Sequence, residues 1–134
     1  MKYGIIYMVM RMIERSPNLR NNIQWTDLEG LVPEDHLLRK IDKVIDFNDI
    51  YDMVEHLYCN DNGRPAVDPV ILVKIVLIQH IFGIKSLRQT VKEIDMNIAY
   101  RWFLGYDFST KIPHFATVSY AFATRFPSEL SMAK

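Results

Sequence analysis

The sequence contains a single cysteine, Cys59, so no disulfide can form within the chain. A chain of 134 residues without disulfides depends on a hydrophobic core, and this length is enough for one domain with a modest core. Apolar residues make up 49% of the sequence and charged residues 24%, a composition typical of a globular domain rather than a disordered one. The lone cysteine also fits a reducing compartment, which predicts a cytoplasmic location.

The sequence lacks the short motifs that mark common catalytic sites: G-x-x-x-x-G-K-[ST], G-x-G-x-x-G, G-x-S-x-G and H-E-x-x-H. The four histidines lie in four different segments, and the pair His56 and Cys59 has no two further ligands at metal-binding spacing. The acidic residues concentrate between positions 34 and 62, where a solvated face explains them better than an acid–base pair. We therefore predict no catalytic residue, no metal site and no cofactor.

The longest apolar stretch, DPVILVKIVLIQHIFG from Asp68 to Gly83, is too short to cross a membrane. As a helix it reaches about 24 Å, less than the roughly 30 Å of hydrocarbon in a bilayer, and Lys74 lies inside it. Asp68 suits an N-cap, Pro69 the first helical position and Gly83 the C-terminal stop. Because the stretch is apolar on nearly every side, we expect residues 69–82 to form the buried central helix of a soluble bundle.

The first 25 residues do not fit this pattern. Residues 1–13 are apolar but lack a signal-peptide cleavage site, and Arg11 interrupts them. Residues 16–25 contain Pro, Ser and three Asn, a composition typical of a linker. We expect residues 1–25 to be a loosely packed N-terminal extension and linker outside the domain.

Apolar residues at helical spacing predict further helices around the central one. Residues 34–45 and 47–58 form two amphipathic stripes, which predict a helical hairpin packed against the central helix. Shorter helices are expected at residues 86–94, 98–104 and 117–126, and residues 127–134 are expected to form a disordered tail. The predicted fold class is therefore all-α, with about six helices in a domain spanning residues 26–126. The side chains expected to face inward in the hairpin are Leu37, Leu38, Ile41, Val44, Ile45, Phe47, Ile50, Tyr51, Val54, Leu57 and Tyr58.

Charge is divided unevenly along a chain whose net charge is zero. Residues 34–62 carry three basic and eight acidic side chains, whereas residues 63–134 carry nine basic and five acidic ones. A surface for an anionic partner, if the chain has one, therefore belongs to the second half.

One constellation in that half is a candidate DNA-binding site. The helices at 86–94 and 98–104, joined by a tight turn, have the spacing of a helix-turn-helix pair, although the turn lacks glycine. Basic residues at i, i+3 and i+7 form a stripe that can face phosphates. An exposed face on an ordinary bundle helix would give the same pattern, so both interpretations stay open at this point. The candidate residues are Lys85, Arg88 and Lys92 in the stripe, Tyr100 and Arg101 as residues that would reach base edges, and Arg125 as additional charge on the last helix.

Three segments resemble the N-terminal domain of bacterial insertion-sequence transposases of the DDE type: Leu31–Phe47, Tyr58–Ile94 and Asn97–Thr117. The most specific parts are LVPEDHLLRKID, GRPAVDPV, IKSLRQ and AYRWFLG. In that family the segment is a helical domain that precedes an RNase H-like catalytic domain and is thought to help recognise the terminal inverted repeats of the element. The resemblance implies that residues 86–104 bind double-stranded DNA.

The same resemblance implies that this chain is not an enzyme by itself, because the family's catalytic Asp, Asp and Glu have no counterpart in it. Residues 1–22 and the ending PSELSMAK also depart from the family pattern, which predicts a truncated copy. The zero net charge and the acidic first half support an alternative hypothesis. In it, the bundle is an interaction domain for transposase self-association, or a truncated regulator of the full-length transposase.

Overall fold

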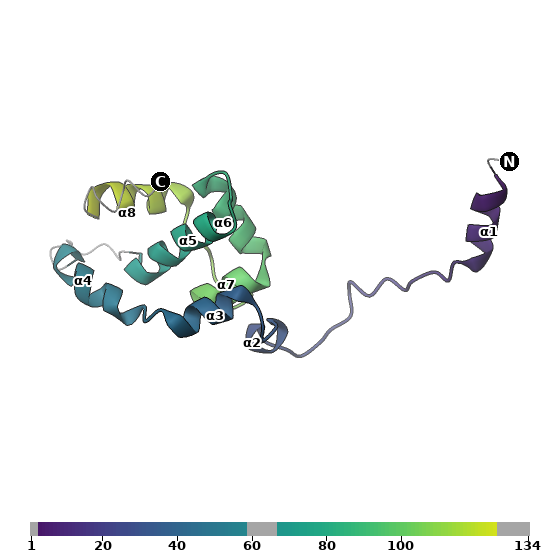
Figure 1. The fold of residues 1–134 in the computed structure, drawn as a ribbon, viewed down its shortest axis with the longest axis horizontal. Helices are drawn as coiled ribbons and strands as arrows, with labels where there is room; N and C mark the ends of the chain where they lie inside the picture. Colours follow the sequence, from purple (N-terminus) through teal and green to yellow (C-terminus); the bar gives the residue numbers. More distant parts are fainter. Residues whose placement is uncertain (1–2, 59–66, 126–134) are drawn as a thin grey trace.

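The computed structural model describes residues 3–58 and 67–125, and every regular element among them is a helix (Figure 1). The all-α prediction is therefore confirmed, with more helices than the six expected. In order they are α1 (Gly4–Met12), α2 (Leu28–Leu31), α3 (Leu37–Val44), α4 (Asn48–Tyr58), α5 (Pro69–Ile81), α6 (Leu87–Met96), α7 (Ile98–Leu104) and α8 (Phe115–Arg125).

Helix α5 begins and ends at the residues that the sequence indicated. The Asp68 carboxylate accepts a hydrogen bond from the N–H of Val70 at 2.8 Å, and Pro69 follows as the first helical residue. At the other end Gly83 has a φ of +62°, a left-handed conformation that glycine adopts without strain. The N–H of Ile84 then bonds the carbonyl of Gln79 at 3.0 Å, which closes the helix end.

The centre of the molecule is shared by α5 and α7. Helix α5 packs mainly on α4, α6 and α7, whereas the short helix α7 packs on α2, α3, α5 and α6. In α5 the side chains of Leu72, Ile75 and Ile78 are fully buried, but Phe82 at its C-terminal end remains 37% exposed. Helix α5 is thus a central, largely buried helix as expected, and α7 provides a second set of core side chains.

Lys74, the one charged residue of α5, is held inside by three kinds of contact. Its ammonium group donates a 2.8 Å hydrogen bond to the carbonyl of Phe103. It lies 4.6 Å and 4.9 Å from the ring centroids of Phe47 and Phe103, and 3.7 Å from the Asp42 carboxylate. A charged group can be buried in a helical core when it is paired and hydrogen-bonded in this way.

The inward face predicted for residues 34–45 was partly wrong. Helix α3 starts only at Leu37, after His36 accepts a hydrogen bond from the N–H of Leu38 at 3.1 Å. Leu38 is fully buried, but Val44 is 84% exposed. Leu37 and Ile45 are exposed as well. The reason is that the second inward position of this short helix is occupied by Arg39.

The inward face predicted for residues 47–58 agrees better with the structure than the one predicted for residues 34–45. Phe47, just before the helix, and Val54 are buried, and Ile50 is half-buried. The Tyr51 hydroxyl donates a 2.7 Å hydrogen bond to Asp68, which raises the pKa of Tyr51 to about 12. The side chains of Leu57 and Tyr58 lie outside the described part of the chain.

The N-terminal segment contains a helix that the sequence did not predict. Helix α1 has no buried residue, and it lies apart from the other helices at the end of an extended segment (Figure 1). None of the helices in the described ranges is long and apolar enough to cross a membrane. The tail predicted for residues 127–134 lies outside the described residues.

Replacing Ile75 by Ala should lower the free energy of unfolding by about 3 kcal/mol, because it leaves a cavity at a fully buried site. Val44→Ala is the matched control, because Val44 in α3 was expected to face inward but is exposed. It should change the free energy of unfolding by less than about 0.5 kcal/mol. Urea denaturation followed by circular dichroism measures both. Equal losses for the two variants would contradict the observed placement of α3.

Candidate nucleic-acid interface

Helix α6 starts at a local cap, Ser86. The Ser86 hydroxyl accepts a hydrogen bond from the N–H of Gln89 at 3.1 Å, as an N-cap does. The reciprocal bond of a capping box is absent, because the Gln89 amide bonds the Glu93 carboxylate at 3.3 Å instead. The Thr90 hydroxyl donates to the Ser86 carbonyl at 2.8 Å, which fixes the buried side of the first turn.

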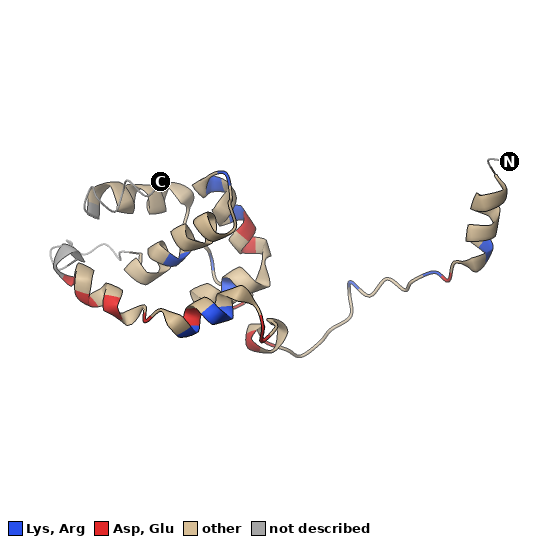
Figure 2. Cartoon of the chain, in the orientation of Figure 1, with Lys and Arg blue, Asp and Glu red and all other residues tan. Residues whose placement is uncertain are grey.

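The basic stripe lies on the outer side of α6. Lys85, Arg88 and Lys92 are all exposed, whereas Thr90 and Ile94 on the opposite side are buried. Basic residues mark the start and middle of α6 in Figure 2. The stripe therefore lies where a partner can reach it, with Arg88 and Lys92 on α6 and Lys85 in the turn just before the helix.

Arg88 is held in place from the side by α8. Its guanidinium carbon lies 4.3 Å above the ring centroid of Phe115, the first residue of that helix. Arginine stacked on an aromatic ring keeps its outer edge available for hydrogen bonds while it loses side-chain freedom. Helix α8 also packs on α6 as a whole, so the stripe rests on a fixed support.

The connection between α6 and α7 is shorter than in a typical helix-turn-helix motif. Asn97 alone separates the two helices: it ends α6 and it also caps α7, by accepting from the N–H groups of Ala99 and Tyr100. A helix-turn-helix motif uses a turn of about three or four residues. The two helices thus lie where the sequence predicted them, but they are joined more tightly.

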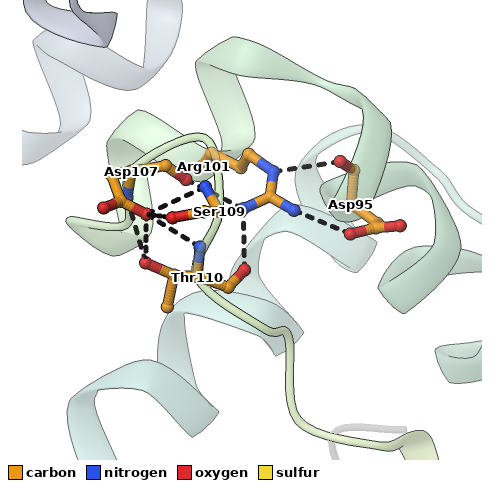
Figure 3. Close-up of polar contacts among 5 residues, drawn as sticks. All are labelled: Asp95, Arg101, Asp107, Ser109 and Thr110. Atoms are coloured by element: carbon orange, nitrogen blue, oxygen red, sulfur yellow. Dashed lines mark hydrogen bonds and ion pairs between the residues drawn. The ribbon is translucent and has the colours of Figure 1, made fainter.

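Arg101 does not reach outward, which corrects its assignment as a base-reading residue. It is only 7% exposed, and its guanidinium donates to the carbonyls of Asp95, Asp107 and Thr110 at 2.8–2.9 Å (Figure 3). It also bonds the Asp95 carboxylate at 2.7 Å. The cause is the loop after α7, which turns back and presents its carbonyl oxygens to the helix, so that the guanidinium is satisfied within the fold.

Asp107 shapes that loop. Its carboxylate accepts hydrogen bonds from the hydroxyl and N–H of Thr110 at 2.6 Å and 2.7 Å, and from the N–H of Ser109 at 3.0 Å (Figure 3). These bonds stabilise the ionised carboxylate and lower the pKa of Asp107 to about 2, led by the Thr110 hydroxyl. The closed turn places the carbonyls of Asp107 and Thr110 around Arg101.

Tyr100 is also buried, with 7% of its surface exposed, so its assignment to base edges is wrong as well. Its ring lies 5.0 Å from that of Phe82, in a tilted arrangement. Burial, with a smaller contribution from the charge of Glu93, raises the pKa of the Tyr100 hydroxyl. Arg125 is the last residue of α8, and its side chain lies outside the described part of the structure.

A second arginine network escaped the sequence analysis. Arg39 is 6% exposed, and it donates to the carbonyls of Glu29 and Val32 and to the Glu29 carboxylate. Its guanidinium lies 4.5 Å from the Trp102 ring, whose N–H donates to Glu29 at 2.6 Å. The hydrogen bonds from Trp102 and Arg39 lower the pKa of Glu29. Only the basic residue within the apolar stripe of α3 could have indicated this network.

No group of three or more His, Cys, Asp or Glu side chains within residues 3–58 and 67–125 is arranged to hold a metal ion. The arrangement of this part of the chain is that of a small helical domain with a basic helix face at its surface.

Comparison with protein families identifies the family of this domain. The family model for the transposase domain (DUF772) matches residues 26–124, which include α2 to α7 and nearly all of α8. The chain therefore belongs to this family of transposase domains, which connects it with transposition. Comparisons with curated proteins and with solved structures give no significant match.

Replacing Arg101 by Met should lower the free energy of unfolding by on the order of 3 kcal/mol, because three carbonyls and a carboxylate lose their donor. Arg88→Met is the matched control, and its stability should change by less than about 1 kcal/mol because Arg88 is exposed. Thermal and urea unfolding measure both. A fully stable Arg101→Met variant would show that the buried network does not hold the domain together.

Proposed function

We propose that this chain is a DNA-binding module of an insertion-sequence transposase of the DDE type, which recognises the terminal inverted repeats and does not cleave DNA by itself. The observation that supports this proposal is the exposed basic stripe, formed by Arg88 and Lys92 on α6 and by Lys85 in the turn before it. Exposed cations along the start of one helix suit contacts with the phosphates beside a groove of double-stranded DNA. Membership of a transposase domain family supplies the biological context.

In this proposal α6, rather than α7, is the helix that meets DNA. Five of the seven residues of α7 are buried, so this helix has little surface to offer. On α6 the neighbours of the basic stripe include Gln89 and Met96, which are both exposed. A glutamine amide can pair with an adenine edge in the major groove, which gives α6 one side chain suited to reading sequence.

The helix pair α5 and α6 fits a helix-turn-helix arrangement better than α6 and α7. Residues 82–86 connect the two helices, and Gly83 in that connection has a positive φ. A turn that contains glycine between a packed first helix and an exposed second helix is typical of this motif. The buried helix α5 would then support α6 in the groove.

The distribution of acidic residues supports an orientation on DNA. Acidic side chains line α4, where Asp49, Asp52 and Glu55 are exposed, and they lie away from α6 in Figure 2. DNA that approached α4 would be repelled, whereas the face of α6 would attract it. The acidic half of the chain is therefore compatible with DNA binding, provided that binding uses α6.

The double variant Arg88→Gln with Lys92→Gln should weaken binding to a duplex that carries the inverted repeat of the element. Affinity decreases with salt concentration, so the slope of log affinity against log salt concentration is negative. For each phosphate that is no longer bound by a cation, this slope should become less steep by roughly 0.9. Fluorescence anisotropy at several salt concentrations measures affinity and slope together.

The matched control is Lys40→Gln with Lys43→Gln, two exposed lysines of α3 that lie outside the proposed interface. It removes the same charge and should leave the slope nearly unchanged. An equal effect of the two double variants would contradict docking through α6. Equal affinity for repeat and random duplexes at every salt concentration would contradict recognition of the element ends.

Helix α1 favours a second function, self-association of the transposase. Ile5, Tyr7, Met8, Met10 and Met12 are each more than half exposed. A helix with so many exposed apolar side chains is typical of a segment that binds another protein surface. A second copy of the chain that packs α1 against α1 would cover these side chains.

The double substitution Ile5→Lys with Met8→Lys should convert an associated species to the monomer, because both residues lie on one side of α1. Light scattering coupled to size-exclusion chromatography measures the mass. A wild-type chain that is monomeric at all concentrations would exclude self-association through α1, and DNA binding through α6 would be unaffected.

A further inference from the structure

A pocket of about 610 Å³ opens beside the basic stripe, at the turn between α5 and α6. Its wall comes from three parts of the fold: Phe82 and Lys85 from the turn, Ser86, Gln89 and Glu93 from the start and middle of α6, and Tyr100 from α7. The pocket is therefore next to the proposed DNA-binding face but contains residues that the stripe itself does not include.

Tyr100 is the unusual member of this wall. It is 93% buried, yet its hydroxyl has no hydrogen-bond partner within residues 3–58 and 67–125. A hydroxyl without a partner in the wall of a pocket is available to donate to a bound acceptor. A tyrosine hydroxyl is protonated at neutral pH and can donate a hydrogen bond, and burial raises the pKa of Tyr100 further.

The first turn of α6, which follows the pocket-lining residue Ser86, offers further donors at the edge of the pocket. The Ser86 side chain accepts from the N–H of Gln89, and the Ser86 carbonyl accepts from the N–H of Thr90. The N–H groups of Leu87 and Arg88 have no acceptor in the described part of the chain. Backbone N–H groups at the start of a helix favour an anion, and Lys85 adds a positive charge just before them.

We infer that this pocket binds one phosphate group of the DNA backbone, with the Tyr100 hydroxyl as the donor from its wall, Lys85 as the counter-charge, and the first-turn N–H groups of α6 as donors at its edge. The inference rests on the proposed docking of DNA along α6, and it adds a specific contact to that docking. A phosphate is an acceptor with several oxygens, which matches a site that combines an unpartnered hydroxyl with free N–H groups.

Glu93 should repel a phosphate, because it lines the same pocket and its carboxylate is negatively charged. The Gln89 amide donates to it at 3.3 Å, which holds the carboxylate on its own side of α6. The phosphate would have to lie toward Lys85 and Tyr100 to keep its distance. The presence of Glu93 makes the inference easy to test, since removal of its charge should strengthen phosphate binding.

Tyr100→Phe removes only the hydroxyl. In the full chain it should weaken binding to a labelled random-sequence duplex by on the order of tenfold, without changing the salt slope. Its thermal midpoint should not fall, because the hydroxyl has no partner to lose within the described ranges. Glu93→Gln should tighten binding several-fold. Tyr120→Phe, an exposed tyrosine of α8, is the matched control and should leave binding unchanged.

The outcomes separate this inference from the proposed function. A wild-type chain that binds no duplex at any salt concentration would overturn both. Wild-type binding that depends on Arg88 and Lys92 but survives Tyr100→Phe unchanged would overturn the phosphate pocket alone.

The ring resonances of Tyr100 in NMR spectra identify the source of the phosphate. They should shift on addition of the duplex, and shift little with inorganic phosphate at the same phosphate concentration. A response to inorganic phosphate alone would indicate a site for a free anion and would overturn the assignment to the DNA backbone.

Discussion

Arg101 carries its positive charge into the interior of the domain, and the fold has to surround it with oxygen atoms. It does so with the last turn of α6 and with the loop after α7, whose carbonyls all point at one guanidinium (Figure 3). A cation bonded to a carbonyl in the last turn of a helix is also favoured by the helix dipole. Because Arg101 fixes α7 inward and holds the end of α6, the opposite side of α6 becomes the surface that a partner can meet.

The buried cations also explain why the net charge of zero says little about this domain. Arg39 and Arg101 are buried and Lys74 is partly buried, and each pairs with an exposed carboxylate: Glu29, Asp95 and Asp42, respectively. Within each pair the two opposite charges largely offset each other. Among the exposed charges, acidic residues gather on α4, whereas Arg88 and Lys92 lie on α6, so the external field differs from one face to another.

Local signals in the sequence were sufficient for much of the fold. Asp68, Pro69 and Gly83 set the limits of α5 through bonds within a few residues of each end, and Ser86 and Asn97 start α6 and α7 in the same way. The exposure of the basic stripe also followed from spacing alone. The family resemblance pointed to the same region, residues 86–104. The family-model match to residues 26–124 confirms that the chain contains a transposase domain.

The wrong predictions concern side chains whose burial depends on a partner far away in the sequence. Arg101 lies in a helix whose sequence does not reveal the acceptors, because the carbonyls of Asp107 and Thr110 reach it only after the loop closes. In α3 the position of Val44 suited the core, but Arg39 turned the helix toward Glu29 and Trp102, and the latter is 63 residues farther along the chain than Arg39. A one-dimensional pattern cannot distinguish a buried, satisfied arginine from an exposed one, since both fit the same helical period.

The burial of Tyr100 could not be predicted from the sequence pattern either, and this residue is part of the proposed phosphate pocket. Its ring packs on Phe82 as a core residue does, while its hydroxyl remains without an acceptor among the residues described. A phenylalanine would satisfy the packing equally well, so the contacts within the described residues do not account for the hydroxyl. A ligand in the pocket would supply the missing acceptor, and the position of Tyr100 behind Lys85 and the first turn of α6 favours an anionic one.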